Sequence, residues 1–264
     1  MVTIVIPHYQ TRELIMLCLR SIRKYTSPPY EVIVVDNDSK DDSLEYLKSV
    51  KWIKLLLKSQ VVKKGSWAHG SALDIGLQHT RTEFFLALHS DVVIKDSSWL
   101  KTLLNPFHQA QLLACVGTGK LEDISTSYRV LKKLGDIKGF LSFLKRNLFY
   151  HFPQLLPEYI RTTCAAYRTE ILKKEKVSFL PREEQGMTSG QALYYELVQR
   201  GYKTLSLPPQ QLKQLIHHFN HGTMILNPAL GARKRTISTG MRRIQKKVNQ
   251  DWLKCLLEDS TFDQ

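Results

Sequence analysis

The sequence lacks the features that mark membrane-spanning, disulfide-bonded and zinc-binding proteins. No uninterrupted apolar run approaches the ~20 residues that a helix needs to cross a bilayer. The chain opens on the strand-like run VTIVI instead of a charged segment followed by a long apolar one, so we expect the mature protein to begin here and to stay cytoplasmic. The cysteines are widely spaced, form no CxxC pair and have mostly apolar neighbours, which predicts buried free thiols: Cys18, Cys115, Cys164 and Cys255.

Acidic residues are scarce relative to basic ones. The chain has 24 Asp and Glu against 38 Lys and Arg, a formal net charge of +14. A surface of this charge attracts nucleic acid, anionic lipid and acidic substrates. Much of the excess lies in the second half, at Lys132-Lys133, Lys145-Arg146 and from Arg233 to Lys247. No helix-turn-helix, RNP or zinc-finger pattern accompanies these bases, so nucleic acid is not the expected partner.

Internal repeats, low-complexity linkers and domain boundaries are also missing. The 264 residues, with 43% hydrophobic content, can bury one full core. We therefore expect a single domain over residues 1–264.

The most informative stretch is FFLALHSDVV, from Phe84 to Val93. Its apolar start predicts a strand buried on both faces of a sheet, which ends at His89-Ser90-Asp91. In open α/β sheets ligands bind at the carboxyl edge, which makes Asp91 the first residue to suspect of chemistry. Asp91 could instead cap the following helix, but Asp96 or Ser97 fills that role better.

Two earlier segments repeat this pattern of a buried strand followed by polar residues. Val2–Pro7 predicts a strand, helical apolar spacing begins at Arg12, and the strand EVIVV ends on polar residues at 36–39. The right-handed crossover of such a βαβ unit places Tyr9 and Asp36 at the same sheet edge.

Glycines precede the next predicted helix. Residues 41–50 predict a helix and 52–57 a short strand, and Gly65 and Gly70 then lead into a helix at 72–77. Such an entry can present backbone N–H groups and the positive helix end to a phosphate. Together with the strand that ends at Asp91, these segments outline one nucleotide-sized crevice.

Four segments in this order, VTIVIPHYQ, EVIVVDNDS, residues 65–77 and ALHSD, resemble the family 2 glycosyltransferases, nucleotide-sugar enzymes of the GT-A fold. The resemblance implies an α/β fold with a mixed central sheet of mostly parallel strands and a helical C-terminal extension. It divides the domain into a Rossmann-like nucleotide-sugar-binding half (1–118), an acceptor-side half (119–223) and a basic helical tail (224–264).

The resemblance also implies a donor site. In the family, an aromatic side chain after the first strand packs near the base, which here is Tyr9. An acidic or amide pair holds the base, which here is Asp36 and Asn37. The donor-binding residues implied are Pro7, Tyr9, Asp36, Asn37, His69, His89, Ser90 and Asp91.

The family's DXD motif, which binds ribose and a divalent metal on the diphosphate, corresponds to His89-Ser90-Asp91. Its last position, the metal-contacting one, is intact in Asp91, whereas its first aspartate is replaced by His89. Hard oxygen ligands and a diphosphate suit Mg²⁺ or Mn²⁺, and a nearby imidazole would favour Mn²⁺. The alternative is that His89 lines the groove without binding metal.

A general base is not obvious in the sequence. Relatives carry an Asp or Glu at the start of the helix that Ser189 can cap, and that carboxylate is absent from residues 187–190. The nearest acids are Glu184, which we favour, and Glu183. The alternative is that both are solvated loop residues.

Three histidines cluster at 217–221. A strand would put His217 and Phe219 on one face and His218 on the other. Family members often have a histidine here that closes over the diphosphate or completes the metal shell, and we favour His221 over His218 for that role.

Two basic segments suggest contacts outside the active site. Residues 128–150 have an apolar stripe opposite lysines and an arginine, typical of an interfacial helix on an anionic membrane. The alternative is an insert that packs on the catalytic lobe or on a second subunit. Residues 230–257 predict a basic helix whose opening segment is a mobile lid. The rest of this helix is expected to pack on the core or on a neighbouring subunit, as in a homodimer.

The resemblance implies an inverting, metal-dependent enzyme that transfers a hexosyl or deoxyhexosyl group from a UDP-, dTDP- or GDP-sugar to a hydroxyl of a lipid-linked or polysaccharide glycan. It would work in the cytoplasm, as a peripheral protein on the inner face of the membrane. Two alternatives remain open. One is a non-catalytic nucleotide-sugar binder, suggested by His89 and the missing base. The other is a basic nucleic-acid-binding α/β protein.

Overall fold

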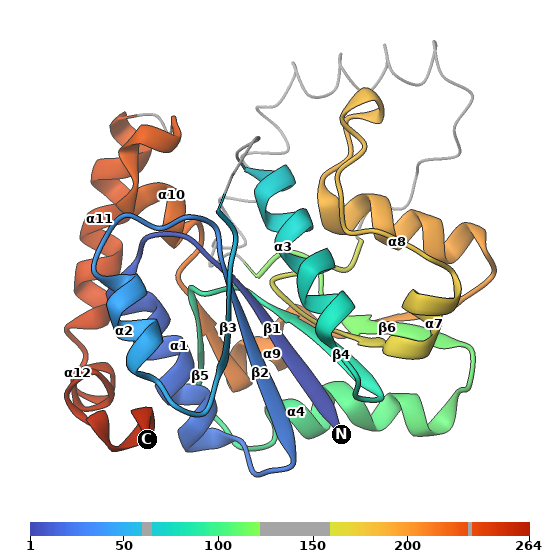
Figure 1. Cartoon of the computed structure of the whole chain (residues 1–264), viewed down its shortest axis with the longest axis horizontal. Coiled ribbons are helices and arrows are strands. Elements are labelled where there is room, and N and C mark those ends of the chain that lie inside the picture. The colour runs from blue at the N-terminus through green and yellow to red at the C-terminus, as the bar shows by residue number, and fades with distance from the viewer. Residues whose placement is uncertain (60–64, 122–158, 232–233) are drawn as a thin grey trace.

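The computed structural model describes residues 1–59, 65–121, 159–231 and 234–264 (Figure 1). The amphipathic segment predicted at 128–150 lies outside the described residues, as do residues 232–233 in the predicted lid. The division at 118 and 223 stays a prediction.

A seven-stranded sheet forms the centre of the fold, in the order β3-β2-β1-β4-β7-β6-β8. Its strands are β1 (Val2–His8), β2 (Tyr30–Asp36), β3 (Lys54–Leu57), β4 (Phe84–Leu88), β6 (Leu113–Gly117), β7 (Cys164–Arg168) and β8 (Lys203–Ser206). Four neighbouring pairs are parallel, and β7 runs antiparallel to both β4 and β6. The predicted mixed, mostly parallel sheet is therefore confirmed.

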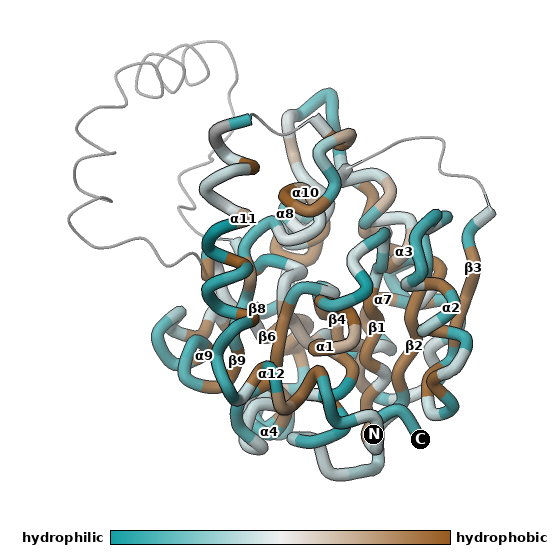
Figure 2. Tube along the Cα trace, turned by 90° about the vertical axis from the view of Figure 1, so that its left-hand side faces the viewer, coloured by the Kyte–Doolittle hydropathy of each residue, from teal (hydrophilic) through white to brown (hydrophobic). Residues whose placement is uncertain are grey.

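Helices cover both faces of this sheet because successive strand residues point to opposite sides. Ile4 and Ile6 face α1, α2 and α4, whereas Val5 faces α3, α7 and α8. Figure 2 shows the apolar strands enclosed by more polar outer segments. The helices are α1 (Arg12–Tyr25), α2 (Ser43–Ser49), α3 (Ser66–His79), α4 (Trp99–Leu104), α7 (Thr169–Lys174), α8 (Ser189–Gln199), α9 (Pro209–Leu215), α10 (Gly222–Leu226), α11 (Lys234–Val248) and α12 (Asp251–Glu258).

A second, two-stranded sheet joins distant parts of the chain. β5 (Val92–Ile94) pairs antiparallel with β9 (Ile216–His218), so that Val92 lies opposite His218. The Phe219 N–H donates to the carbonyl of Asp91 at 3.0 Å, which continues the pairing by one step. This ladder fixes the segment after β4 against the start of the C-terminal region.

The basic tail is helical, as predicted, but it forms two helices because the chain turns at 249–250 between α11 and α12. Ile244, Leu253 and Leu256 pack on the outer face of α1, as their spacing predicts. Trp252, on the same helix, is 36% exposed, in contrast to the buried Leu253 and Leu256. Figure 1 shows α11 and α12 beside α1, on the side away from α7 and α8.

All four cysteines are free thiols, as predicted. Cys18, Cys115 and Cys164 are buried, whereas Cys255 is exposed because it lies on the outer face of α12. Within the described ranges, no helix has both the length and the apolar character that a bilayer crossing requires.

Candidate active site

A cavity of about 650 Å³ opens at the carboxyl ends of β1, β2 and β4. Because β7 runs antiparallel to β4, its start also lies at this edge, where the His89 N–H donates to the carbonyl of Thr163 at 3.0 Å. Residues from five segments form much of the wall: Pro7, His8 and Tyr9; Asn37 and Asp38; Ser66 and His69; His89, Ser90 and Asp91; and Thr188, Ser189 and Gly190. The crevice that the strand pattern predicts is therefore present.

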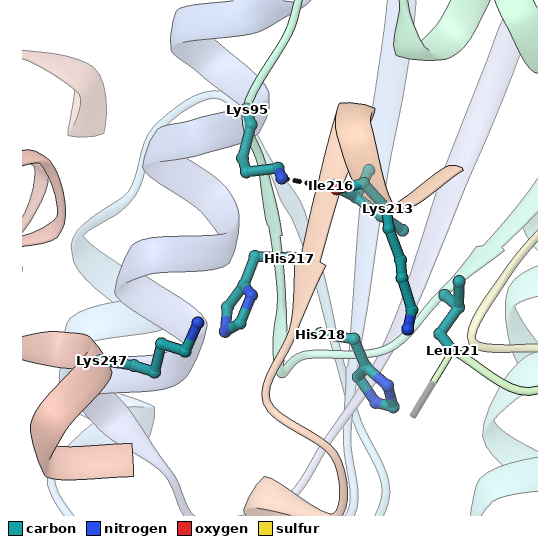
Figure 3. Close-up of a pocket in the computed structure, with 7 residues that line it drawn as sticks. All are labelled: Lys95, Leu121, Lys213, Ile216, His217, His218 and Lys247. Atoms are coloured by element: carbon teal, nitrogen blue, oxygen red, sulfur yellow. Dashed lines mark hydrogen bonds between the residues drawn. The ribbon is translucent and has the colours of Figure 1, made fainter. Parts of the chain in front are cut away.

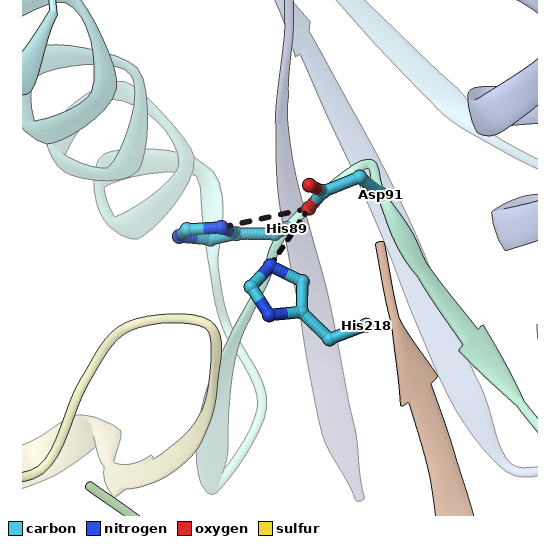
Figure 4. Close-up of side chains that lie close together, drawn as sticks. All are labelled: His89, Asp91 and His218. Carbon is cyan, nitrogen blue, oxygen red and sulfur yellow. Dashed lines mark ion pairs between the residues drawn. The ribbon is translucent and has the colours of Figure 1, made fainter. Parts of the chain in front are cut away.

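His89, Asp91 and His218 meet on one side of this cavity (Figure 4). One ring nitrogen of His218, Nε2, lies 3.2 Å from Oδ1 of Asp91, and Nδ1 of His89 lies 3.7 Å from the same oxygen. Ligand atoms of all three residues lie within 4.8 Å of one another. The loop after β4 supplies two of them, and β9 supplies the third.

Asp91 is fixed in place by its second oxygen, Oδ2, which accepts the Gly222 N–H at 2.8 Å. Burial by itself would raise the pKa of this carboxyl, but the interactions with His218 and His89 outweigh burial and hold the pKa well below its ordinary value. Asp91 therefore remains ionised at neutral pH, with Oδ1 directed toward the two imidazoles.

These three residues fit a divalent cation. The Nδ1 atom of His218 is buried and has no hydrogen-bond partner among the described residues, and Nε2 faces Oδ1 of Asp91 without the alignment of a hydrogen bond. Two imidazoles with one carboxylate are a nitrogen and oxygen donor set, which suits Mn²⁺ better than Mg²⁺. The geometry therefore supports a metal centre at the DXD-like motif.

Gly222 is required at this centre. A Cβ atom on Gly222 would lie 2.6 Å from Cδ1 of Leu14 and 3.1 Å from Oδ2 of Asp91. Gly222→Ala should therefore shift the Asp91 carboxylate and weaken Mn²⁺ binding about tenfold to a hundredfold, the effect of disturbing a residue that supports a ligand. Isothermal titration with Mn²⁺ measures this. Gly186→Ala is the control: its added methyl group meets open space, and its φ of +64° makes it the more strained of the two substitutions in backbone conformation. Equal affinities in the two variants would contradict the role given to Gly222.

The ends of β1 and β2 build the side of the cavity that the family resemblance assigns to the nucleobase. Tyr9 and Asn37 line it, and the Asn37 N–H donates to the carbonyl of His8 at 2.9 Å. Asp36 does not line it, because its carboxylate accepts the N–H and the hydroxyl of Ser39. The structure thus places Asn37 at the cavity wall, with Asp36 holding the loop behind it.

The comparisons with known proteins agree with this geometry. The family model Glycosyl transferase family 2 matches residues 3–175. The chain belongs to this family. By sequence alone, no curated protein matches it.

Solved structures of low sequence identity share the fold, among them the following three. A mannosyltransferase from Pyrobaculum calidifontis, in complex with GDP-mannose and Mn²⁺, is 15% identical with a TM-score of 0.55. The match covers 97% of this chain and 78% of the mannosyltransferase chain. Glucosyl-3-phosphoglycerate synthase from Mycobacterium tuberculosis, in complex with Mn²⁺, UDP and glucosyl-3-phosphoglycerate, is 17% identical with a TM-score of 0.53. The match covers 92% of this chain and 79% of the synthase chain. TarS (1–349) from S. aureus is 17% identical with a TM-score of 0.52, and the match covers 95% of this chain and 66% of the TarS chain. The GT-A fold of this family 2 glycosyltransferase is thereby confirmed.

The structure brings His218, rather than His221, into the three-residue group. His221 lines the same cavity but is exposed, and it lies in a turn where its φ is +63°. The strand alternation correctly placed His217 beside Phe219, whose rings lie 4.9 Å apart, and so left His218 on the other face. The sequence did not show that this face meets Asp91, and a ligand role for His221 stays a prediction.

His69 extends the group on the side of α3. Its Nε2 lies 2.9 Å from Oγ1 of Thr162, and its ring meets that of His89 edge to face, with 4.8 Å between centroids. Burial, with a smaller effect of His89, lowers the pKa of His69 to about 3. A neutral imidazole therefore stands beside the charged group, in the wall that the family resemblance assigns to the donor.

The two glycines that the sequence places before a helix have different roles, since Gly65 precedes α3 and Gly70 lies inside it. Gly65 lines the cavity, and its φ of +65° is one that L side chains rarely adopt. Gly70 allows α3 to approach the chain at Phe179, since a Cβ atom there would lie 2.2 Å from the Phe179 carbonyl oxygen. Only Gly65 stands where a phosphate could approach the helix entry.

Glu183 and Glu184 do not line the cavity. Both are exposed in the turn η2 (Glu183–Gln185), which the paired Arg182 and Met187 close. The cavity wall is instead formed by Thr188, which precedes α8, and by the first residues of that helix. A role as general base for either glutamate stays a prediction, and it would require this turn to move toward the cavity.

His8 is a buried residue at the site that sequence reasoning missed. Its Nε2 lies 2.9 Å from Oγ of Ser43, and burial lowers its pKa to about 4 although Asp36 and Asp41 favour the charged form. The imidazole therefore stays neutral and supports the end of β1. Its position in the strand run VTIVIPH was the available signal, since the alternation of that strand turns it toward the same face as Ile6.

A smaller cavity of about 170 Å³ lies behind His218 (Figure 3). Lys95, Lys213 and Lys247 line it together with His217, and it shares Leu121 and His218 with the larger cavity. The Lys95 ammonium donates to the Lys213 carbonyl. Part of the basic excess of the chain is thus collected next to the metal-binding group.

Proposed function

We propose that the chain transfers a sugar from a nucleotide-diphospho-sugar, a UDP-, dTDP- or GDP-sugar, to a hydroxyl of a glycan or lipid-linked acceptor. The observation that carries the proposal is the His89-Asp91-His218 group, set in the wall of a cavity whose other end is formed by Tyr9 and Asn37. A nucleotide could then bind with its nucleobase at Tyr9 and Asn37 and its diphosphate beside the cation at the other end. The family and the Mn²⁺ complexes of the similar structures support this assignment.

In the proposed reaction, His89, Asp91 and His218 would hold Mn²⁺ or, less favourably, Mg²⁺. When bound, such a cation neutralises the charge that develops on the leaving nucleoside diphosphate. Asp91 orients the group because Gly222 fixes its carboxylate, and Tyr9 and Asn37 bind the base. An acceptor oxygen attacks the anomeric carbon from the side opposite the diphosphate, in a single inverting displacement of a hexosyl or deoxyhexosyl group.

The test combines binding with transfer. A thermal-shift screen of UDP, dTDP and GDP and their sugars, with and without Mn²⁺, should show one nucleotide whose stabilisation depends on Mn²⁺, because ligand binding stabilises the folded state in proportion to occupancy. Release of the nucleoside diphosphate from the selected donor then measures turnover. Absence of any Mn²⁺-dependent shift would overturn the proposal.

A second candidate function is a non-catalytic nucleotide-sugar binder. It is favoured by one observation: Asp38 and Asp91, the carboxylates that line the larger cavity among the described residues, both lie on the donor side. Binding of a donor without hydrolysis or transfer would identify this function. Family membership gives no support to the alternative of a nucleic-acid-binding protein.

Glu184→Gln separates these functions if the turn at 183–185 moves to the acceptor. We expect transfer to fall about a hundredfold, the usual contribution of a general base, while donor hydrolysis and nucleotide binding stay within threefold. Glu183→Gln is the matched control on the same turn and should retain transfer. Full transfer in both variants would reject a base in this turn.

We also propose that the protein associates with an anionic membrane surface on the cytoplasmic side. The net charge of +14 and the bases of α11 support this. Vesicles containing anionic lipid should co-sediment the protein at low salt, whereas neutral vesicles should not. Equal recovery with both kinds of vesicle would contradict an electrostatic association. A homodimer stays a further prediction, which sedimentation of the same samples without vesicles can check.

A further inference from the structure

Arg161 holds a positive charge on the wall of the larger cavity. It is half-buried and lies between the end of β6 and the start of β7, where its backbone N–H donates to the Thr118 carbonyl at 2.9 Å. Its guanidinium carbon lies 5.1 Å from the centre of the Tyr159 ring. The Tyr159 hydroxyl in turn lies 3.1 Å from Oγ1 of Thr188, just before α8. These contacts connect Arg161, through Tyr159, to the residue that precedes α8.

No described carboxylate neutralises Arg161. Of the acidic residues that line the cavity, Asp38 forms an ion pair with Lys40, and Asp91 faces His89 and His218. The side chain of Arg161 has no ion pair or hydrogen bond with the part of the chain that the structure describes. Its planar guanidinium keeps five N–H donors that suit a carboxylate or a phosphate.

Hydroxyl groups line the same cavity as Arg161. They belong to Thr162, Thr163, Thr188 and Ser189, and each can donate to an anionic oxygen. A neutral sugar hydroxyl would leave the Arg161 charge without a counter-ion, whereas an anionic group would satisfy it. The wall on this side is thus suited to a ligand that carries negative charge of its own.

We propose that the acceptor carries an anionic group, a phosphate or a carboxylate, and that Arg161 binds it. This inference rests on the proposed function, since it takes the donor to occupy the side of Tyr9 and Asn37. The anionic group lies beside the reacting hydroxyl and sets acceptor specificity. The competing ligand for Arg161 is the diphosphate of the donor itself.

The experiment compares three small probes on the full chain, first alone and then with the selected nucleotide and Mn²⁺. Glycerol 3-phosphate, glycerate and glycerol offer a phosphate, a carboxylate and no charge. We expect at least one charged probe to bind about tenfold or more tightly than glycerol, because a hydrogen bond to a charged group contributes that much. Whichever charged probe binds more tightly identifies the anion.

Arg161→Gln should weaken the favoured probe about tenfold to a hundredfold, Arg161→Lys should retain part of its affinity, and nucleotide affinity should change less than threefold in both. Arg12→Gln is the control, since Arg12 is an exposed arginine paired with Asp42 on the surface. Unfolding temperatures confirm that each variant is folded. The inference is overturned if charged probes bind no better than glycerol, or if Arg161→Gln weakens the nucleotide and not the probe. Failure of the proposed function would be seen in a different measurement, as the absence of nucleotide binding by the wild type. In that case the titrations without nucleotide still decide whether Arg161 binds an anion.

Discussion

Replacing Asp91 with asparagine is expected to reduce sugar transfer about a hundredfold to a thousandfold, the range found when a group that stabilises developing charge is removed. Asparagine has nearly the same shape, so its Oδ1 can still accept the Gly222 N–H that Oδ2 of Asp91 accepts now. The amide NH₂ would then face His89 and His218 in place of a carboxylate oxygen. Since an NH₂ group cannot bind a cation, Mn²⁺ affinity should fall together with transfer.

Two measurements check this expectation. Electron paramagnetic resonance gives the fraction of free Mn²⁺, and release of the nucleoside diphosphate gives the rate. Asp42→Asn is the control, because Asp42 is an exposed carboxylate that pairs with Arg12 away from the cavity. Transfer by Asp91→Asn within threefold of wild type, at saturating Mn²⁺, would remove Asp91 from the metal centre.

The largest effect on stability is expected at Asp263, near the C-terminal end of the sequence. Both of its carboxylate oxygens accept hydrogen bonds from the buried guanidinium of Arg20, and the Tyr46 hydroxyl donates to Oδ1 at 2.9 Å. Asp263→Ala leaves the Arg20 charge buried without its counter-ion. Breaking a buried ion pair in this way costs about 3–5 kcal/mol of unfolding free energy.

Urea unfolding at neutral pH measures the loss. Asp259→Ala is the matched control: it removes a nearby exposed carboxylate that accepts the Thr261 N–H, and should cost far less stability than Asp263→Ala. The double variant with Arg20→Met and Asp263→Leu should recover at least half of the stability, because apolar side chains can replace a buried ion pair. Equal losses for Asp263→Ala and Asp259→Ala would contradict a buried role for Asp263.

Local features of the sequence predicted much of the fold and half of the metal site. The runs that became β1, β2 and β4 are largely apolar and are followed by polar residues, so both their burial and their position at one edge follow from neighbouring residues. Asp91 was found in this way. The resemblance of four such segments to one family then placed Tyr9 and Asn37 on the base side.

Long-range contacts could not be predicted in the same way. His218 reaches Asp91 only because β9 pairs with β5, and a single sequence does not specify which strands pair. Arg20 interrupts the apolar face of α1 and gave no signal, because its partner is 243 residues away. The turn with Glu183 and Glu184 was expected near the acceptor from sequence proximity to α8, but Thr188 and Ser189 line the cavity and the two glutamates do not.

The pairing of β5 with β9 also determines when the metal centre can form during synthesis of the chain. Every strand of the seven-stranded sheet, from β1 to β8, precedes His218 in the sequence. A chain that is still being made can therefore complete its central sheet while it has only two of the three metal-binding residues. Capture of Mn²⁺ by the proposed centre would then report that β9 has paired with β5, and a product shortened before residue 216 would lack His218 and bind the ion more weakly.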